Sequence, residues 1–377
     1  MPWVERSVMA ERREFVRLAL LEGANRRGLC RRFGISPRVG YKWLARFAAE
    51  GEAGLADRSR RPGRSPARSA EPVEAAVLAV REAHPCWGGR KIRAVLAREG
   101  GAAVPAASTI TAILRRKGRI APEASLARQP CRRFERAAPN ELWQLDFKGH
   151  FPLARGRCHP LTALDDHSRY AVLLAACADE RGGTVQAGLT LASRRHGLPF
   201  AMLMDNGAPW GGAWDREAFT PLTAWLLRLG IEVHHGRPYH PQTQGKEERF
   251  HLTLALELLR RGGFPDLARA QAAFDAWRDA YNHDRPHEAL GQATPASRYR
   301  PSPRPFPESL PPVEYAPGVI VRRVHEGGRI EFHGRRFRVG KAFTGYPVGL
   351  RPTAEDGRFE VLSCHQKIAA LDLTAGP

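Results

Sequence analysis

Three acidic residues occupy positions that suit the binding of divalent metal ions. Asp146 interrupts the apolar segment 142–147, where an unpaired carboxylate is costly unless something positive binds it. Asp205 ends the apolar segment 200–204 and Glu248 lies in a later helical pattern. Carboxylate oxygens are the ligands that Mg²⁺ prefers, and converging carboxylates can hold two Mg²⁺ ions that grip the attacking and leaving oxygens of a phosphoryl transfer. We predict such a site, with Mn²⁺ able to replace Mg²⁺.

The helix expected from about residue 244 decides how the third carboxylate is presented. Glu248 shares one helical face with Leu252, Leu256 and Leu259, so we expect it to prolong a buried stripe and to point inward. Glu247 would then point about 100° away, although it stays an alternative third ligand. Taken singly, each acid also fits a structural role, as a buried carboxylate, a turn former or a residue favoured at a helix start.

Alternating strand and helix patterns surround these acids. Three strand patterns come first, then a helix, a strand, a second helix, a short strand and two further helices, which predicts an α/β domain with a mixed sheet. Ligands lie at the carboxyl ends of strands in open α/β sheets, and Asp205 stands at such an end. The expected strands are 142–147, 158–164, 170–175, 200–204 and 232–235, and the expected helices are 183–196, 216–229 and those starting near 244 and 267.

The first part of the chain predicts a helix-turn-helix unit over residues 1–56. Apolar residues at helical spacing are followed by Gly34-Ile35-Ser36, in which Ser36 is the expected N-cap of the next helix. That helix would enter the major groove of DNA and offer Arg38, Tyr41 and Lys42 to bases or phosphates. An ordinary helical hairpin is the alternative, because this motif is short and degenerate.

A basic linker and a second helical unit follow. Residues 57–70 lack apolar periodicity, and Arg60, Arg61 and Arg64 could lie in a minor groove or simply be solvated. Residues 71–121 repeat the helical plan, so they are either a second helix-turn-helix-like domain or a structural spacer. In the first case its last helix would present three basic residues to DNA, namely Arg115, Arg116 and Lys117.

The rest of the chain divides by composition. A connector at 122–137 leads to the α/β core at 138–300, and a Pro-rich linker occupies 301–317. Residues 318–377 contain short strand patterns separated by Gly-containing turns, which predicts a small β-barrel. The whole chain is therefore expected to be multidomain.

Charge points to nucleic acid as the partner. The 59 Lys and Arg residues exceed the 39 Asp and Glu residues, for a net charge of +20, and a polyelectrolyte partner is the usual reason for such self-repulsion. A GC-rich genome would raise arginine but does not require an excess over acids. The six cysteines form no C-x-x-C pair, and no apolar stretch suits a signal peptide or a membrane span. We expect a cytoplasmic, nucleoid-associated protein without a membrane or small-molecule partner.

Several ordered blocks resemble one protein family. They are Trp143-Gln144-Leu145-Asp146, Met204-Asp205-Asn206-Gly207, the segment 239–250 (YHPQTQGKEERF), Asp165-Asp166-His167-Ser168-Arg169, and the segments 281–287 and 290–295. Together they resemble bacterial insertion-sequence DDE transposases with a retroviral-integrase-like catalytic core. The resemblance covers residues 138–300 closely and the flanking domains in outline.

The resemblance implies a ribonuclease-H-like core whose catalytic and metal-binding residues are Asp146, Asp205 and Glu248. It implies Mg²⁺-dependent cleavage at the 3′ ends of a mobile element and strand transfer into target DNA. Double-stranded DNA, as terminal inverted repeats and as target, and a homo-oligomer assembled on DNA are the expected partners. The alternatives are a transposase-derived regulator without catalysis and a nuclease that only cleaves. The implied DNA contacts of the core are Tyr239, Gln242, Gln244, Lys246 and Arg249.

Overall fold

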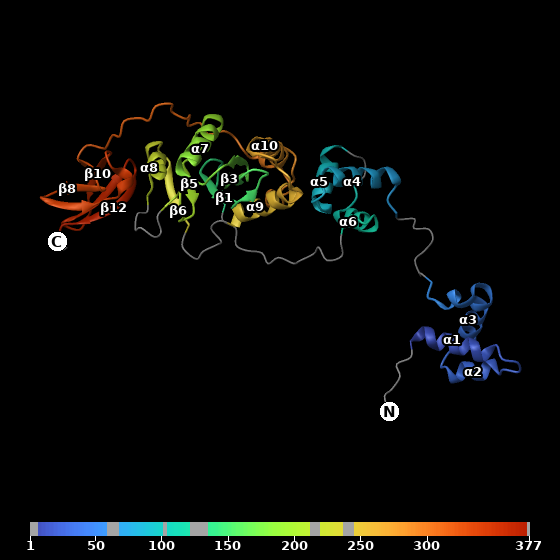
Figure 1. The fold of residues 1–377 in the computed structure, drawn as a ribbon. Helices are drawn as coiled ribbons and strands as arrows, with labels where there is room; N and C mark the ends of the chain where they lie inside the picture. The colour runs from blue at the N-terminus through green and yellow to red at the C-terminus, as the bar shows by residue number, and fades with distance from the viewer. Residues whose placement is uncertain are drawn as a thin grey trace. The chain divides into compact units, whose positions relative to one another are not determined.

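The computed structural model describes residues 7–58, 68–100, 104–120, 135–211, 219–236 and 245–374 (Figure 1). The chain divides into two compact units, Met1–Arg68 and Ser69–Pro377. The finer division into seven segments stays a prediction. Among the described helices, none combines the length and the apolar character that crossing a membrane requires.

The first unit contains the expected helix-turn-helix. Its helices are α1 (Val8–Ala19), α2 (Arg26–Arg32) and α3 (Pro37–Glu50), followed by the 3₁₀ helix η1 (Gly51–Leu55). The turn before α3 uses Gly34 at φ 65°, and the hydroxyl of Ser36 accepts a hydrogen bond from the backbone N–H of Val39, as an N-cap does. The core of the unit consists of Phe15, Val16, Ala19, Cys30, Trp43 and Leu55.

The second unit begins with three more helices, α4 (Glu71–Ala83), α5 (Gly89–Arg98) and α6 (Ala107–Arg116). Trp87 and Ile92 join the apolar faces of α4 and α6 in a core of their own. The buried Glu74 of α4 pairs with Arg116 and, at 3.7 Å, with Lys117. The helical content expected for 71–121 is therefore present.

A six-stranded mixed sheet follows, in the order β2-β3-β1-β5-β6 with β4 on β3. The pairs β1–β3, β3–β4 and β2–β3 are antiparallel, whereas β1–β5 and β5–β6 are parallel. The predicted order of strands and helices is confirmed, with the short strand β2 added. The strands are β1 (Leu142–Phe147), β2 (Phe151–Pro152), β3 (Arg157–Asp165), β4 (Ala171–Cys177), β5 (Ala201–Met204) and β6 (Glu232–His235).

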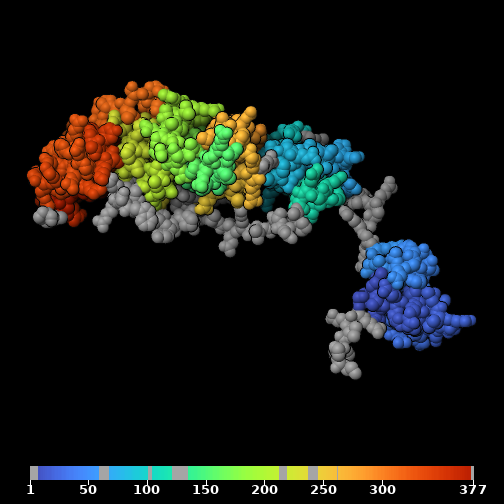
Figure 2. Space-filling view, in the orientation of Figure 1, coloured from blue at the N-terminus to red at the C-terminus, as the bar shows by residue number. Residues whose placement is uncertain are grey.

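Helices cover both faces of this sheet (Figure 1). The helices α7 (Gly182–His196) and α8 (Pro221–Arg228) pack on the face that includes Trp143 and Leu145. The helices α9 (Gly245–Glu257) and α10 (Leu267–His283) bury Leu254 and Phe274 on the opposite face, and Figure 2 shows their yellow and orange surface directly against the green strands. Because side chains alternate along a strand, Gln144 and Asp146 face the α9 side.

The C-terminal segment forms two small sheets. Strands β7 (Ile320–Arg323), β10 (Pro347–Pro352), β11 (Arg358–Ser363) and β12 (Gln366–Asp372) form one antiparallel sheet, and β8 (Arg329–Phe332) pairs with β9 (Arg335–Arg338). The predicted strands are present, but β7 and β12 stand at the two edges of an open strand order, so the structure supports small sheets rather than a closed barrel. The remaining 3₁₀ helices are η3 (Leu259–Arg261), η4 (Glu288–Leu290), η5 (Pro295–Ser297) and η6 (Lys341–Phe343).

Candidate active site

Two of the predicted ligands meet at the carboxyl ends of neighbouring parallel strands. Gln144 of β1 is paired with Leu203 of β5. Asp146 and Asp205 each lie two residues further along, so the strand register brings them to adjacent positions at the same sheet edge. A backbone N–H of Gly207 donates to Oδ1 of Asp205 at 3.2 Å and holds the turn that ends β5.

Burial and mutual repulsion perturb these two carboxyl groups. Burial first, and then the charge of Asp205, raises the pKa of Asp146 to about 6. Burial is also the main reason why the pKa of Asp205 lies above its ordinary value. Glu180 lies near enough to raise both pKa values further, and sequence reasoning did not single it out. The two neighbouring carboxylates repel each other when both are ionised. A hard divalent cation bound to their oxygens would stabilise the ionised forms.

The orientation predicted for Glu248 is wrong. Glu247 is 1% exposed and lies in the buried stripe of α9, whereas the side chain of Glu248 is exposed. The stripe runs through Glu247, Phe250, His251 and Leu254. It is one residue, or about 100°, out of phase with the predicted one, because the apolar positions chosen from the sequence were not those that meet the sheet.

An exposed flank position still suits a metal ligand that must meet DNA. Glu248 lies three residues before His251, and such residues are neighbours on a helix surface. Nδ1 of His251 lies 3.7 Å from Oδ2 of Asp146, so Glu248 is on the flank of α9 that borders Asp146. Among the residues that the structure describes, however, no three His, Cys, Asp or Glu side chains gather closely enough to hold a metal ion.

A buried polar cluster supports Asp146 from beneath. The hydroxyl of Thr162 donates to the carbonyl oxygen of Asp146 at 2.9 Å and also lies 2.9 Å from Nε2 of His251. Oε2 of Glu247 lies 3.2 Å from the same hydroxyl. Burial lowers the pKa of His251 to about 3 and raises that of Glu247 well above its ordinary value, so burial favours the neutral form of both groups.

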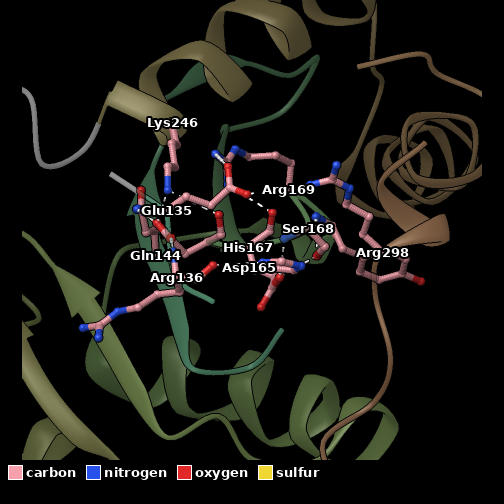
Figure 3. A network of polar contacts seen from close by, with 11 residues as sticks. Glu135, Arg136, Gln144, Asp165, His167, Ser168, Arg169, Lys246 and Arg298 are labelled. Atoms are coloured by element: carbon pink, nitrogen blue, oxygen red, sulfur yellow. Dashed lines mark hydrogen bonds and ion pairs between the residues drawn. The ribbon is translucent and has the colours of Figure 1, made fainter. Parts of the chain in front are cut away.

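A second network lies at the turn between β3 and β4 (Figure 3). The buried Asp166 accepts a hydrogen bond from Nε2 of Gln144 at 2.7 Å and pairs with the ammonium of Lys246. The neighbouring Asp165 caps the turn by accepting from the backbone N–H groups of Asn140 and Ser168 at 2.7 and 2.8 Å. Gln144, Asp165, Asp166 and Ser168 were noted in the sequence only as part of a resemblance, and Lys246 only as a DNA contact, because their contacts with one another are mostly long-range.

The predicted DNA contacts of the helical modules have different surroundings. Arg38, Tyr41 and Lys42 are exposed on α3, as a groove-binding helix requires. Arg115 is exposed at the end of α6, but Arg116 and Lys117 are engaged with Glu74. These assignments to DNA stay predictions.

The predicted DNA contacts of the core are described only in part. Arg249 is exposed on α9, whereas the ammonium of Lys246 is turned onto Asp166 and its side chain is 17% exposed. Six further predicted contacts, three in the basic linker and three in the core, lie outside the described residues, namely Arg60, Arg61, Arg64, Tyr239, Gln242 and Gln244.

Family models match most parts of the chain. Models of the integrase core domain match residues 136–241 and 229–295. A model of the C-terminal domain of IS481 family transposases matches 319–376. A helix-turn-helix domain matches 11–63 and a homeodomain-like domain matches 39–114.

Curated relatives come from insertion elements. The chain is 30% identical over 159 residues to an uncharacterized 31.7 kDa protein of insertion element IS407 from Burkholderia multivorans, covering 42% of this chain and 55% of that protein. It is 32% identical over 158 residues to a 39.2 kDa protein of insertion element IS476 from Xanthomonas euvesicatoria, covering 42% and 44%. The chain thus spans about half the length of these relatives.

Solved structures of viral integrases are also similar. An intasome of simian T-cell lymphotropic virus, in complex with a PP2A regulatory subunit, is 17% identical with a TM-score of 0.40, and the match covers 78% of this chain and 94% of that chain. The catalytic core of HTLV-2 integrase in complex with magnesium is 16% identical with a TM-score of 0.33, covering 43% and 97%.

The mixed sheet and the matches of residues 136–241 and 229–295 to integrase core models define the class of this domain, which is an integrase core domain. Within that class, the resemblance to insertion-sequence DDE transposases is confirmed by the match of the C-terminal segment to IS481 family transposases and by the two insertion-element relatives.

Proposed function

We propose that this chain is a DNA transposase that cleaves the 3′ ends of a mobile element and joins them to target DNA. The observation that carries the proposal is the pairing of Asp146 and Asp205 at the ends of two adjacent parallel strands, inside an integrase core domain. Helix-turn-helix modules ahead of this core supply a means of holding the element's terminal repeats.

In this proposal, Asp146, Asp205 and Glu248 hold the metal ions. Asp146 and Asp205 offer oxygens from the sheet edge, and Glu248 approaches from the exposed flank of α9. When bound, Mg²⁺ supplies charge that stabilises the attacking and leaving oxygens of an in-line displacement at phosphorus. Thr162 and His251 keep Asp146 in place, and Gly207 keeps Asp205 turned toward the site.

One site can serve two reactions of the same kind. Water first attacks the phosphorus at the element end, and the bond between that phosphorus and the element's own 3′-oxygen breaks, which leaves a 3′-hydroxyl on the element and a 5′-phosphate on the flanking DNA. That hydroxyl then attacks a phosphorus of the target, a new P–O bond forms, and the target's own 3′-oxygen leaves. Because two element ends must be joined, a homo-oligomer assembled on DNA is part of the proposal.

The test is strand transfer of a labelled duplex, taken from the DNA that flanks the gene, into a plasmid in Mg²⁺. Wild type is compared with Asp205→Asn, with DNA binding measured in parallel. Joined product from wild type and none from the variant, at equal DNA binding, supports the transposase. Cleavage without joining would identify a nuclease, and specific binding without either reaction in wild type would identify a regulator.

A further inference from the structure

Asp166 is a buried carboxylate between two elements that carry proposed metal ligands. It is fully buried, and it accepts hydrogen bonds from Nε2 of Gln144 and from the backbone N–H of Arg136, both at 2.7 Å. The ammonium of Lys246 pairs with its carboxylate and lies 3.3 Å from its carbonyl oxygen. Figure 3 shows Lys246 reaching from the start of α9 to this cluster.

The two side chains that contact Asp166 each lie two residues before a proposed metal ligand. Gln144 is two residues before Asp146 on β1, and Lys246 is two residues before Glu248 on α9. Residues two apart on a strand share a face and lie roughly 6.6 Å apart. Holding Gln144 in place therefore also holds the end of β1 that carries Asp146.

The contacts of α9 limit the rotation of this helix about its own axis. Lys246 and Glu248 lie about 100° to either side of the buried Glu247, so they occupy opposite flanks of the helix. The ion pair holds one flank against Asp166, and Nδ1 of His251, in the buried stripe, lies 3.7 Å from Asp146. A helix held at one flank and along its buried stripe has little freedom to turn about its axis, and its rotation decides where Glu248 points.

We propose that Asp166 is a positioning residue that sets the placement of Glu248 relative to Asp146 by clamping Lys246 of α9 to Gln144 of β1. The inference rests on the proposed function. In this inference the ammonium of Lys246 acts inside the protein, as one half of the ion pair with Asp166. A buried ion pair is favourable only while both partners are present.

The test measures Mn²⁺ binding by the full-length protein, from the signal of free Mn²⁺ in electron paramagnetic resonance, together with strand transfer. The variants are Asp166→Asn, Lys246→Gln, the double variant and Asp165→Asn. Asp165 is the matched control, because it is equally buried and adjacent but its carboxylate accepts from the backbone N–H groups of Asn140 and Ser168.

We expect Asp166→Asn to weaken Mn²⁺ binding by about tenfold or more, the range seen when groups that support a metal ligand are removed. Lys246→Gln should weaken binding in the same direction, and the double variant should be no weaker than Asp166→Asn, because the two residues act through one contact. Asp165→Asn should lower the unfolding temperature but leave Mn²⁺ affinity within about twofold of wild type.

Two results would overturn the inference while leaving the proposed function intact. One is wild-type Mn²⁺ affinity and joining in both Asp166→Asn and Lys246→Gln. The other is an equal loss in Asp165→Asn, which would mean that general destabilisation is responsible. If Asp166→Asn does not fold, Lys246→Gln decides. The proposed function itself would be contradicted by a different pair of results. These are that wild type does not join DNA and that Asp205→Asn binds Mn²⁺ as tightly as wild type.

Discussion

At the scale of single residues, Glu247 and Glu248 show how neighbouring carboxylates can take opposite roles. Glu247 is buried against Thr162, and burial raises its pKa well above the ordinary value and so favours its neutral form, whereas Glu248 is exposed on the flank beside His251. A neutral buried acid is a poor ligand for a cation, since binding would require both deprotonation and desolvation.

We therefore predict different outcomes for two isosteric changes. Glu248→Gln should lower the rate of strand transfer by about a thousandfold or more, with the free energy of unfolding changed by less than about 0.5 kcal/mol because the side chain is exposed. Glu247→Gln should keep joining within about tenfold of wild type, because it replaces one neutral group by another. Rates from single-turnover assays and unfolding curves check both, and the reverse ranking would make Glu247 the ligand.

When no metal is bound, the ionised carboxylate of Asp146 should lower the free energy of unfolding. Its pKa is raised from 3.8 to about 6 by burial and by Asp205. For a carboxyl whose folded pKa exceeds its unfolded one, stability is present at low pH and is lost as the pH rises through the folded value. At pH 7.5 the ionised group therefore opposes folding.

Asp146→Asn should accordingly raise the stability of the chain in a chelator at pH 7.5 by about 1–2 kcal/mol, while abolishing joining. The gap to wild type should shrink toward pH 5, where Asp146 becomes protonated. Thermal unfolding of both proteins across this pH range is the measurement. A variant less stable than wild type at pH 7.5 would show that the carboxylate stabilises the fold through contacts not governed by its charge.

At the scale of elements, close approach between helices depends on glycine in the second helical module. A Cβ built on Gly89 at the start of α5 would lie 2.3 Å from the carbonyl oxygen of Ala107 and 2.5 Å from Oγ1 of Thr111 on α6. The preceding Gly88 meets nothing within 4 Å. The two glycines thus form a matched pair, one at a helix contact and one in open space.

Gly89→Ala should destabilise the module by about 1–3 kcal/mol, because α5 and α6 must separate to admit the methyl group. Gly88→Ala should change stability by less than about 0.5 kcal/mol. Denaturant unfolding of the full chain, followed by the fluorescence of Trp87 in the same core, distinguishes the two. Equal effects would mean that the helices adjust without cost.

At the scale of the whole molecule, buried histidines should make the second unit sensitive to acid. Burial lowers the pKa of His196 to about 4 and those of His251 and His287 to about 3. When the folded pKa is depressed below the unfolded value of about 6.5, stability is present above that value and is lost as the pH falls toward the folded pKa. His196 packs edge-on against Tyr170 and Tyr299, where a charged ring would be poorly solvated.

We expect wild type to lose about 2 kcal/mol more than His196→Gln between pH 7 and pH 5, because the variant lacks that ionisation. Thermal unfolding at both pH values, with the same chelator present, gives the difference between the two proteins. Parallel losses in wild type and variant would show that the pKa of His196 is the same in the folded and unfolded states.

Periodicity and local chemistry in the sequence determined which elements form and where Asp146 and Asp205 lie. Strand alternation and turn residues are encoded within a few neighbouring positions, so the order of strands and helices along the chain, the α3 cap at Ser36 and both strand-end acids could be predicted. A parallel pairing of β1 with β5 then brings the two acids together. The small C-terminal β-barrel was expected from short strand patterns separated by Gly-containing turns, and such a pattern does not specify which edges pair.

Only the tertiary structure decided which face of α9 is buried and what Lys246 contacts. A shift of one residue turns a helix by about 100°, and Leu, His and Glu near the start of α9 allow more than one stripe. Contacts with Thr162 and Asp166, which lie 85 and 80 residues away in the chain, selected the stripe through Glu247 and drew Lys246 inward. Such a choice depends on the shape and charge of the partner surface, which no local segment of the sequence contains.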